Sequence, residues 1–184
     1  MGNGVSAATG LSSNDCARSD TIRRFQIQLA GEAIRVGQAL GYPLEKTTPE
    51  GKLVDSLVID GQTLYASGQV AFDGDQLVSK GKVPSQVSLE AATQAAALCA
   101  ANLLRAVRKR LGSLDRVERV LRITGYVNAD PDFTDEHLVI NGASQLVRDV
   151  FGEAGRHART ALGLAQLPLG SSVEVEMILK IKKD

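Results

Sequence analysis

The stretch GRHARTALGLAQLPLGSSVEVE, residues 155–176, decides the fold that this sequence predicts. Two apolar runs lie on either side of a loop at residues 167–172, a pattern that predicts two strands joined as a closing hairpin. Arg159 opens the first strand, and Glu174 stands between two valines of the second strand, on the face opposite theirs. A charged side chain beside core positions needs a partner or a ligand, so Arg159 and Glu174 are candidate functional residues.

An ordinary half-exposed strand also explains these residues. Glu174 and Glu176 alternate with apolar neighbours, and Arg156 and Arg159 could form a solvated face. In a hairpin that turns at residues 167–172, Arg159 would lie on the order of 15 Å from Glu174 along the strands, at about 3.3 Å per residue. Spacing alone therefore leaves both interpretations open.

The composition is typical of one globular domain: 184 residues, of which 43% are hydrophobic and 23% charged. The formal net charge is zero and there is no tryptophan, which weighs against a nucleic-acid partner. Cys16 and Cys99 form no CxxC pair, and His137 and His157 form no HxxH motif, so we expect neither a disulfide framework nor a metal site. We expect a cytoplasmic protein that uses no metal and no organic cofactor.

The N-terminal region has a composition of its own. Residues 1–20 are rich in glycine, serine and alanine and predict a disordered leader. Gly2 begins a pattern that fits N-myristoylation, and Cys16 could carry a second acyl chain; the alternative is a plain tail. We expect no membrane partner unless Gly2 is acylated, because no apolar run reaches the roughly 18 residues of a membrane span. Residues 21–41 predict an extra N-terminal helix of a single domain that covers residues 21–184.

The middle of the chain predicts helices that alternate with strand pairs. The elements are a turn at Asp60-Gly61, a loop over 72–86, a helix from Ser88 to Gly112, a strand over 117–128 and a helix that ends near Phe151. This order predicts an α+β fold, one sheet with helices on one face. Two helices cannot cover all the apolar strand surface, which predicts self-association through the sheet. That surface is supplied by Val58, Leu64, Val70, Leu121, Ile123, Leu164, Val173, Val175 and Ile178.

Five segments, taken in order, resemble the Rid/YjgF family of reactive intermediate deaminases, also called endoribonuclease L-PSP, over residues 50–182. They are SGQV at 67–70, GSLDRV at 112–117, VN at 127–128 before PDFT at 131–134, INGAS at 140–144 and FGEAGRHAR at 151–159. The GRHAR form resembles one branch of that family. The resemblance implies a chorismate-mutase-like α+β fold and a homotrimer, in which three sheets line a central β-barrel and the helices lie outside.

The resemblance also implies clefts between subunits that bind small carboxylates. Carried over to this sequence, the arginine that grips the carboxylate of an unstable imine or enamine is Arg159, and the glutamate that activates the attacking water is Glu174. The remaining cleft positions fall on Ser67, Gly68, Asn141 and the backbone at Ala161. Leu53 departs from the family, which has a cleft tyrosine near this position.

Three functional hypotheses follow. The first is an imine or enamine deaminase that converts reactive 2-imino acids, such as 2-aminoacrylate, to a 2-keto acid and ammonia. The second is a non-catalytic module or sensor that binds small carboxylates through Arg159, which the missing tyrosine at Leu53 favours. The third is an endoribonuclease, against which the zero net charge and the scarcity of aromatic residues count.

Overall fold

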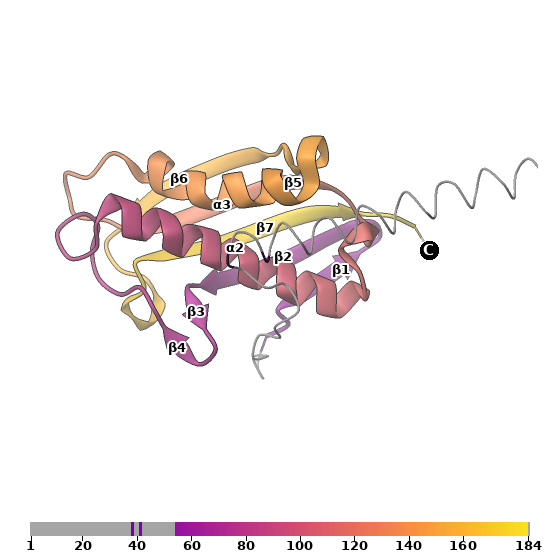
Figure 1. Cartoon of the computed structure of the whole chain (residues 1–184), viewed down its shortest axis with the longest axis horizontal. Coiled ribbons are helices and arrows are strands. Elements are labelled where there is room, and N and C mark those ends of the chain that lie inside the picture. The colour runs from indigo at the N-terminus through magenta and orange to yellow at the C-terminus, as the bar shows by residue number, and fades with distance from the viewer. Residues whose placement is uncertain (1–37, 39–40, 42–53, 184) are drawn as a thin grey trace, which may run out of the picture.

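The structure, a computed structural model, describes residues 54–183 together with Gln38 and Gly41 (Figure 1). The predictions of a leader over residues 1–20 with an acylated Gly2 and of a helix over 21–41 lie outside the described residues, apart from these two positions, as does the departure at Leu53.

One five-stranded sheet forms the frame of the domain, with the strand order β1-β2-β7-β5-β6 (Figure 1). All neighbouring strands are antiparallel except β5 and β6, which run parallel. The strands are β1 (Leu57–Asp60), β2 (Thr63–Val70), β5 (Val117–Asn128), β6 (Ala158–Leu164) and β7 (Val173–Ile181). The prediction of a strand over 117–128 is confirmed.

The first hairpin turns one position beyond the predicted Asp60-Gly61 pair. β1 pairs with β2 up to Asp60 and Thr63, so the two turn residues are Gly61 and Gln62, and Gly61 has the positive φ that such a turn requires. The loop predicted over 72–86 needs a correction, because it contains a small separate hairpin of β3 (Phe72–Asp73) and β4 (Gln76–Leu77). Gly74, also at positive φ, makes that turn possible.

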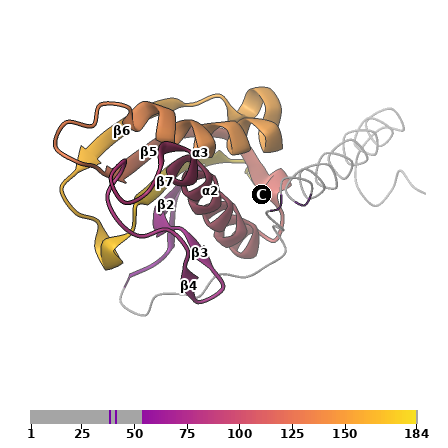
Figure 2. The same cartoon turned by 60° about the vertical axis from the view of Figure 1, so that its left-hand side comes forward.

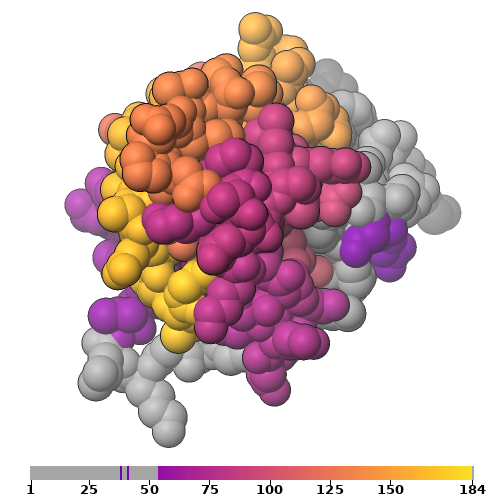
Figure 3. All heavy atoms as spheres, turned by 90° about the vertical axis from the view of Figure 1, so that its left-hand side faces the viewer, coloured from indigo at the N-terminus to yellow at the C-terminus, as the bar shows by residue number. Residues whose placement is uncertain are grey.

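Two helices cover one face of the sheet, α2 (Leu89–Leu111) and α3 (Glu136–Phe151) (Figure 2). Ser88 caps α2 by accepting the Ala91 N–H at 3.1 Å, and Gly112 ends it in the left-handed conformation, as the sequence predicts. The helices lie directly against one another (Figure 3). At Gly142 the backbones come so close that a Cβ would overlap the carbonyl oxygen of Thr93, so only glycine permits this approach.

The core lies between the sheet and these two helices. It buries one face of β2, β5 and β7 together with the alanine-rich face of α2, and partly buried residues of β1 and β6 pack against it. The opposite face of the sheet carries no helix within the described residues, and several large apolar side chains are exposed there or half-buried. These include Val58, Tyr65, Leu162, Leu164 and Ile178. The predicted fold class, one main sheet with helices on one face, is therefore confirmed.

The predicted closing hairpin is wrong. β6 and β7 do not pair, because β5 lies between them, parallel to β6 and antiparallel to β7. The chain between them includes a short 3-10 helix, η3 (Pro168–Gly170), and passes the end of β5, where the Asn128 side-chain amide donates to the Ser171 carbonyl at 3.2 Å. Alternation of apolar residues defines the faces of a strand but not its neighbours, so a crossover looked like a hairpin.

Candidate carboxylate-binding and proton-transfer site

Arg159 leaves the sheet on the helix-covered side. It lies beside Ile123 of β5, whose side chain is fully buried under the helices, and paired residues of neighbouring strands share a face. Its Nη1 donates to Asn141 Oδ1 at 2.8 Å and to Ser144 Oγ at 3.2 Å, both on α3. The structure therefore brings together two residues that the resemblance assigns to the cleft, Arg159 and Asn141.

Among the described residues, one nitrogen of the Arg159 guanidinium holds the side chain in place. Within the described part of the chain, Nη1 makes both hydrogen bonds, and neither Nε nor Nη2 has a partner. Nε and Nη2 form one edge of the planar group and present two parallel N–H donors, which match the two oxygens of a carboxylate. Arg159 is thus anchored to α3, and its Nε and Nη2 edge has no partner in the part of the chain that the structure describes.

Ala161 follows on the same face of β6 and packs against the core. Near Arg159, a groove of about 640 Å³ runs between α2 and α3, and its lining includes both acceptors of Arg159, Asn141 and Ser144. Thr93 and Gln145 also line this groove. The arginine and its acceptors therefore lie beside an open volume on the helical side of the molecule.

Glu174 leaves the sheet on the other side. It lies opposite Tyr126 of β5 and Val70 of β2, while its neighbours Val173 and Val175 point into the core. β2 is irregular between Ala66 and Gln69, and a Cβ at the intervening Gly68 would overlap Glu174 Oε1. Glycine at this position lets the carboxylate lie against the backbone of β2.

Ser67 and Gly68 are the two residues at this irregularity. Ser67 is exposed, and its Oγ donates to the Asp55 carbonyl at 3.0 Å. The structure therefore brings Gly68 and Glu174 together, with Ser67 next to them in the chain. These three residues form a second cluster that is separate from the cluster of Arg159 and Asn141.

The surroundings of Glu174 favour its protonated form. Partial burial raises the pKa of this carboxyl, and the negative charge of Glu176 raises it further. The pKa of Tyr126 on the neighbouring strand is also raised, by burial first, then by its hydrogen bond to Glu176 and the charges of Glu176 and Glu174. A carboxyl with a raised pKa is better matched to proton transfer near neutral pH than an ordinary glutamate.

The two clusters do not meet within one chain. Arg159 and Glu174 pair with residues of β5 that are three positions apart, Ile123 and Tyr126, which amounts to about 10 Å along the strand. Arg159 points toward α3 and Glu174 toward the open face. A pocket containing both side chains of the same chain is therefore excluded, and a common site needs two copies.

Two residues beside Arg159 are missing from the sequence-based set of site residues. Ser144 contacts Arg159 directly, and His157 Nε2 lies 3.0 Å from Ser144 Oγ. The signals were present: Ser144 lies one helical turn after Asn141, and His157 stands two residues before Arg159. These positions did not identify Ser144 and His157 as neighbours of Arg159, because nothing in the sequence spacing indicates that α3 packs over β6.

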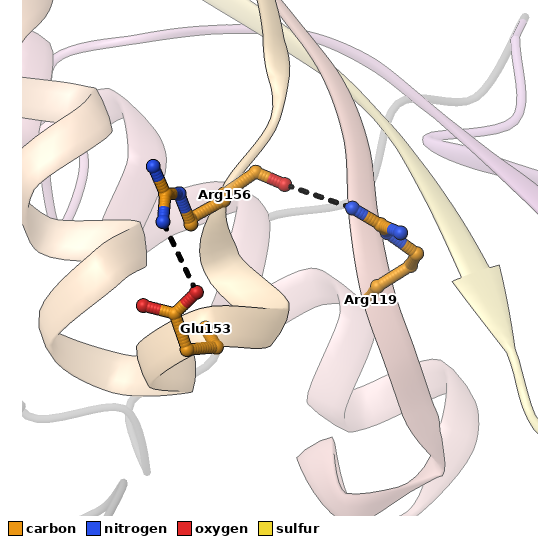
Figure 4. A network of polar contacts seen from close by, with 3 residues as sticks. All are labelled: Arg119, Glu153 and Arg156. Carbon is orange, nitrogen blue, oxygen red and sulfur yellow. Dashed lines mark hydrogen bonds and ion pairs between the residues drawn. The ribbon is translucent and has the colours of Figure 1, made fainter.

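The backbone that leads into β6 is held from two sides (Figure 4). Arg156 Nη1 forms an ion pair with Glu153 Oε2 at 3.2 Å, and Arg119 Nη2 donates to the Arg156 carbonyl oxygen at 3.5 Å. All three side chains are on the surface, so each contact contributes little stability by itself. Together they tie the segment before His157 to its own short helix, η2 (Gly152–Gly155), and to β5.

No three histidine, cysteine, aspartate or glutamate side chains converge into a possible metal site among residues 54–183. In that range neither helix has both the length and the apolar character needed to cross a bilayer.

Comparison with known proteins agrees with this architecture. A family described as "YjgF/chorismate mutase-like, putative endoribonuclease" matches residues 36–181. Protein TCP17 of Trypanosoma cruzi is 37% identical over 145 residues, which cover 78% of this chain and 91% of that protein. The crystal structure of Atu1372 from Agrobacterium tumefaciens, a protein described as having unknown function, is 37% identical and has a TM-score of 0.80 over 87% of this chain and 99% of the other.

A more distant structure supports the fold alone. A putative endoribonuclease from Shewanella oneidensis MR-1 is 24% identical, with a TM-score of 0.76 over 81% of this chain and 99% of that one. The family match covers well over half of the chain, and its chorismate-mutase-like description agrees with the single sheet and its two covering helices. The protein therefore belongs to the Rid/YjgF family.

Proposed function

We propose that this protein is an imine and enamine deaminase that hydrolyses reactive 2-imino acids, such as the species formed from 2-aminoacrylate, to 2-keto acids and ammonia. The observation that carries this proposal is the state of Arg159, which is anchored through Nη1 and keeps its Nε and Nη2 edge unpartnered within the described chain. This edge of Arg159 carries a permanent positive charge and two parallel N–H donors, and these are sufficient to bind a carboxylate.

Glu174 supplies the proton transfers in this proposal. Its carboxylate takes a proton from water as the water oxygen bonds to the C=N carbon, the π electrons of that bond move to nitrogen, and the carboxyl passes the proton to that nitrogen, which gives a carbinolamine. The carboxylate then takes the hydroxyl proton of the carbinolamine as the C=O bond forms, and passes it to the amine nitrogen as the C–N bond breaks and ammonia leaves. Imine plus water thus gives keto acid plus ammonia, and the raised pKa of Glu174 suits a group that both accepts and donates.

The complete site is shared between subunits of a homotrimer. Two features support this assembly: the opposite orientation of Arg159 and Glu174 in one chain, and the apolar side chains on the open face of the sheet. Arg159 and Asn141 of one subunit would face Ser67, Gly68 and Glu174 of its neighbour. Closed symmetry repeats this junction at every subunit boundary.

A carboxylate-binding module is the second candidate. One observation favours it: Arg159 and Asn141 contact each other within one chain, whereas Glu174 lies on the opposite face of the sheet, so a single chain could bind a carboxylate without hydrolysing an imine. The two candidates differ in turnover, not in ligand class, which makes a kinetic experiment decisive.

The test combines a coupled assay with a binding measurement. A serine dehydratase generates 2-aminoacrylate, and the rate of imine decay above the spontaneous rate is measured with wild type and four variants. Pyruvate titration by calorimetry reports the binding of a carboxylate product. Arg156→Ala is the matched control, because it removes a neighbouring exposed arginine whose described partner is Glu153.

We expect Arg159→Ala to lose both binding and turnover, and Arg159→Lys to remain poor because a point charge does not replace two parallel bonds. Glu174→Gln should keep pyruvate affinity and slow turnover by roughly 10²–10⁴-fold, the range for a lost general acid–base. Wild-type binding without accelerated imine decay would establish the binding module instead. Unchanged pyruvate affinity in Arg159→Ala would reject both candidates.

A further inference from the structure

We infer that Ser144 and His157 form a directed hydrogen-bond chain that positions the guanidinium of Arg159 for its carboxylate ligand. This inference rests on the proposed function and adds two positioning residues to it. The chain begins at the carbonyl oxygen of Gly155, passes through the His157 ring and the Ser144 hydroxyl, and ends at Arg159 Nη1.

The first link fixes the tautomer of His157. Its Nδ1 lies 2.6 Å from the carbonyl oxygen of Gly155. A carbonyl oxygen can only accept a hydrogen bond, so Nδ1 must carry the proton. In the neutral ring, Nε2 is then an acceptor, and the position of the backbone at Gly155 decides which ring nitrogen faces the site.

The second link orients the hydroxyl of Ser144. Its Oγ lies 3.0 Å from His157 Nε2, and because that nitrogen accepts, the hydroxyl donates to it. Once the O–H bond points at His157, the lone pairs of Oγ point elsewhere. Arg159 Nη1 lies 3.2 Å from this oxygen and can only donate. With the His157 ring neutral, every hydrogen bond in the chain therefore runs in one direction.

The start of the chain is rigid because Gly155 is packed against α3. Gly155 is buried, and an added Cβ there would press on the backbone of Val147 and Arg148. Ser144 lies on the same helix, so both ends of the His157 bridge rest on α3. The orientation of Nη1 is thereby set by backbone and helix, and Asn141 Oδ1, at 2.8 Å, adds a second acceptor for the same nitrogen.

As a consequence, the nitrogens of the Arg159 guanidinium have two separate roles. Two fixed acceptors hold Nη1, while Nε and Nη2 remain available for the ligand. An exposed arginine free to rotate would have to be ordered when the ligand binds, and this ordering weakens affinity. Ser144 and His157 remove that cost before binding, although the described contacts place neither of them on the ligand-binding edge.

The experiment measures pyruvate affinity by calorimetry for the full-length protein in four forms: Ser144→Ala, His157→Phe, the double variant and the control His137→Phe. The chain has two histidines, so His137 is the natural match. We expect each of the first two variants to weaken pyruvate binding about 10-fold, the usual effect of one lost hydrogen bond to a charged group. His137→Phe should bind like wild type.

The double variant gives the sharper result. If His157 acts only through Ser144, the double variant should bind no more weakly than Ser144→Ala alone. Effects that multiply to about 100-fold would overturn the directed chain, because the two side chains would then act independently. In the coupled imine assay the single variants should raise KM and leave kcat within about 2-fold, as expected for lost positioning of a binding group.

Nitrogen-15 spectra of the wild-type protein provide a test that does not depend on any variant folding. His157 should show a protonated Nδ1 and an unprotonated Nε2, and saturation with pyruvate should shift its signals but not those of His137. The opposite tautomer would overturn the inference. If Arg159→Ala loses pyruvate binding while Ser144→Ala and His157→Phe retain it, the inference fails and the proposed function stands; if Arg159→Ala itself binds normally, the proposed function fails.

Discussion

Arg159 and Glu174 flank the same strand, β5, from its two sides, and their side chains leave the sheet on opposite faces. This relationship defines two complementary half-sites on each chain. One half-site lies on the edge strand β6, under α3, and the other lies on the open face beside the irregularity in β2. A deaminase built on this chain must bring the two together across a subunit boundary, which leads to the first prediction.

Co-expression of Arg159→Ala and Glu174→Gln chains in equal amounts should restore activity that neither variant has alone. In a cyclic trimer with sites shared between neighbours, every mixed trimer contains one intact site, so random mixing restores about one quarter of wild-type activity. Imine decay per chain is the measurement, and the separately expressed variants are the controls. Zero recovery in verified mixed trimers would contradict a site shared between neighbouring subunits.

The pH at which turnover falls should depend on the charge of Glu176, because that charge raises the pKa of Glu174. Activity should fall as the pH decreases through the pKa of Glu174, which lies above the ordinary value of 4.5. Glu176→Gln removes the like charge and should move this acid limb to lower pH, while burial still keeps it above the ordinary range. The measurement is kcat/KM against pH after subtraction of spontaneous hydrolysis. If the acid limb lies at the same pH in wild type and Glu176→Gln, Glu174 is not the group that titrates.

The same raised pKa predicts a change in thermal stability. A carboxyl whose pKa is higher in the folded state favours folding when protonated, and this contribution is lost as the pH rises through the folded-state pKa. Glu174→Gln should therefore raise the Tm at pH 7 and change it little at pH 4. Scanning calorimetry at both values tests this, with Glu118→Gln, on the surface, as the control.

The open face of the sheet should hold the trimer together. We expect light scattering after size exclusion to give about three times the chain mass of 19.5 kDa. Leu162 is 44% exposed on that face in the single chain, so Leu162→Asp should dissociate the assembly and leave the far-ultraviolet circular dichroism unchanged. Leu169→Asp, at an exposed loop position, is the matched control; a trimer that survives Leu162→Asp would place the interface elsewhere.

The contact between α2 and α3 should tolerate no side chain at Gly142. A Cβ there would overlap the backbone carbonyl of Thr93, which cannot rotate away, so Gly142→Ala should destabilise the fold by about 1–3 kcal/mol. Urea unfolding measures the change, and Gln145→Ala on the exposed side of the same helix is the reference. Equal stability of the two variants would show that the helices separate at little cost.

The sequence predicts correctly those elements whose ends are determined by residues close together in the chain. Ser88 and Gly112 mark the ends of α2 because capping needs a side-chain acceptor at one end and a left-handed residue at the other. The hairpin turn that begins at Gly61, inside the predicted Asp60-Gly61 pair, has the same local character. The two-residue strands β3 and β4 were missed, since segments this short carry no periodicity.

The arrangement of the site depends on the order of the strands and the packing of the helices, which neighbouring residues in the chain do not determine. Arg159 and Glu174 stand out in the sequence as charged residues in apolar strands, but the predicted hairpin of their two strands was wrong because β5 lies between β6 and β7. Contacts such as Ser144 with Arg159 depend on how α3 packs over β6, and side-chain alternation does not encode that. The resemblance placed Asn141 near Arg159, and the described contacts agree.

The irregularities of β5 have a consequence for how this sheet tolerates changes in length. Both of its register shifts relative to β7 fall before Arg122, whereas pairing from Arg122 to Val127 is uninterrupted. A residue gained or lost in the first half could be absorbed by the existing bulges. One gained between Ile123 and Tyr126 would turn every later side chain to the other face. Natural relatives should therefore vary in length before Arg122 and keep a fixed spacing after it.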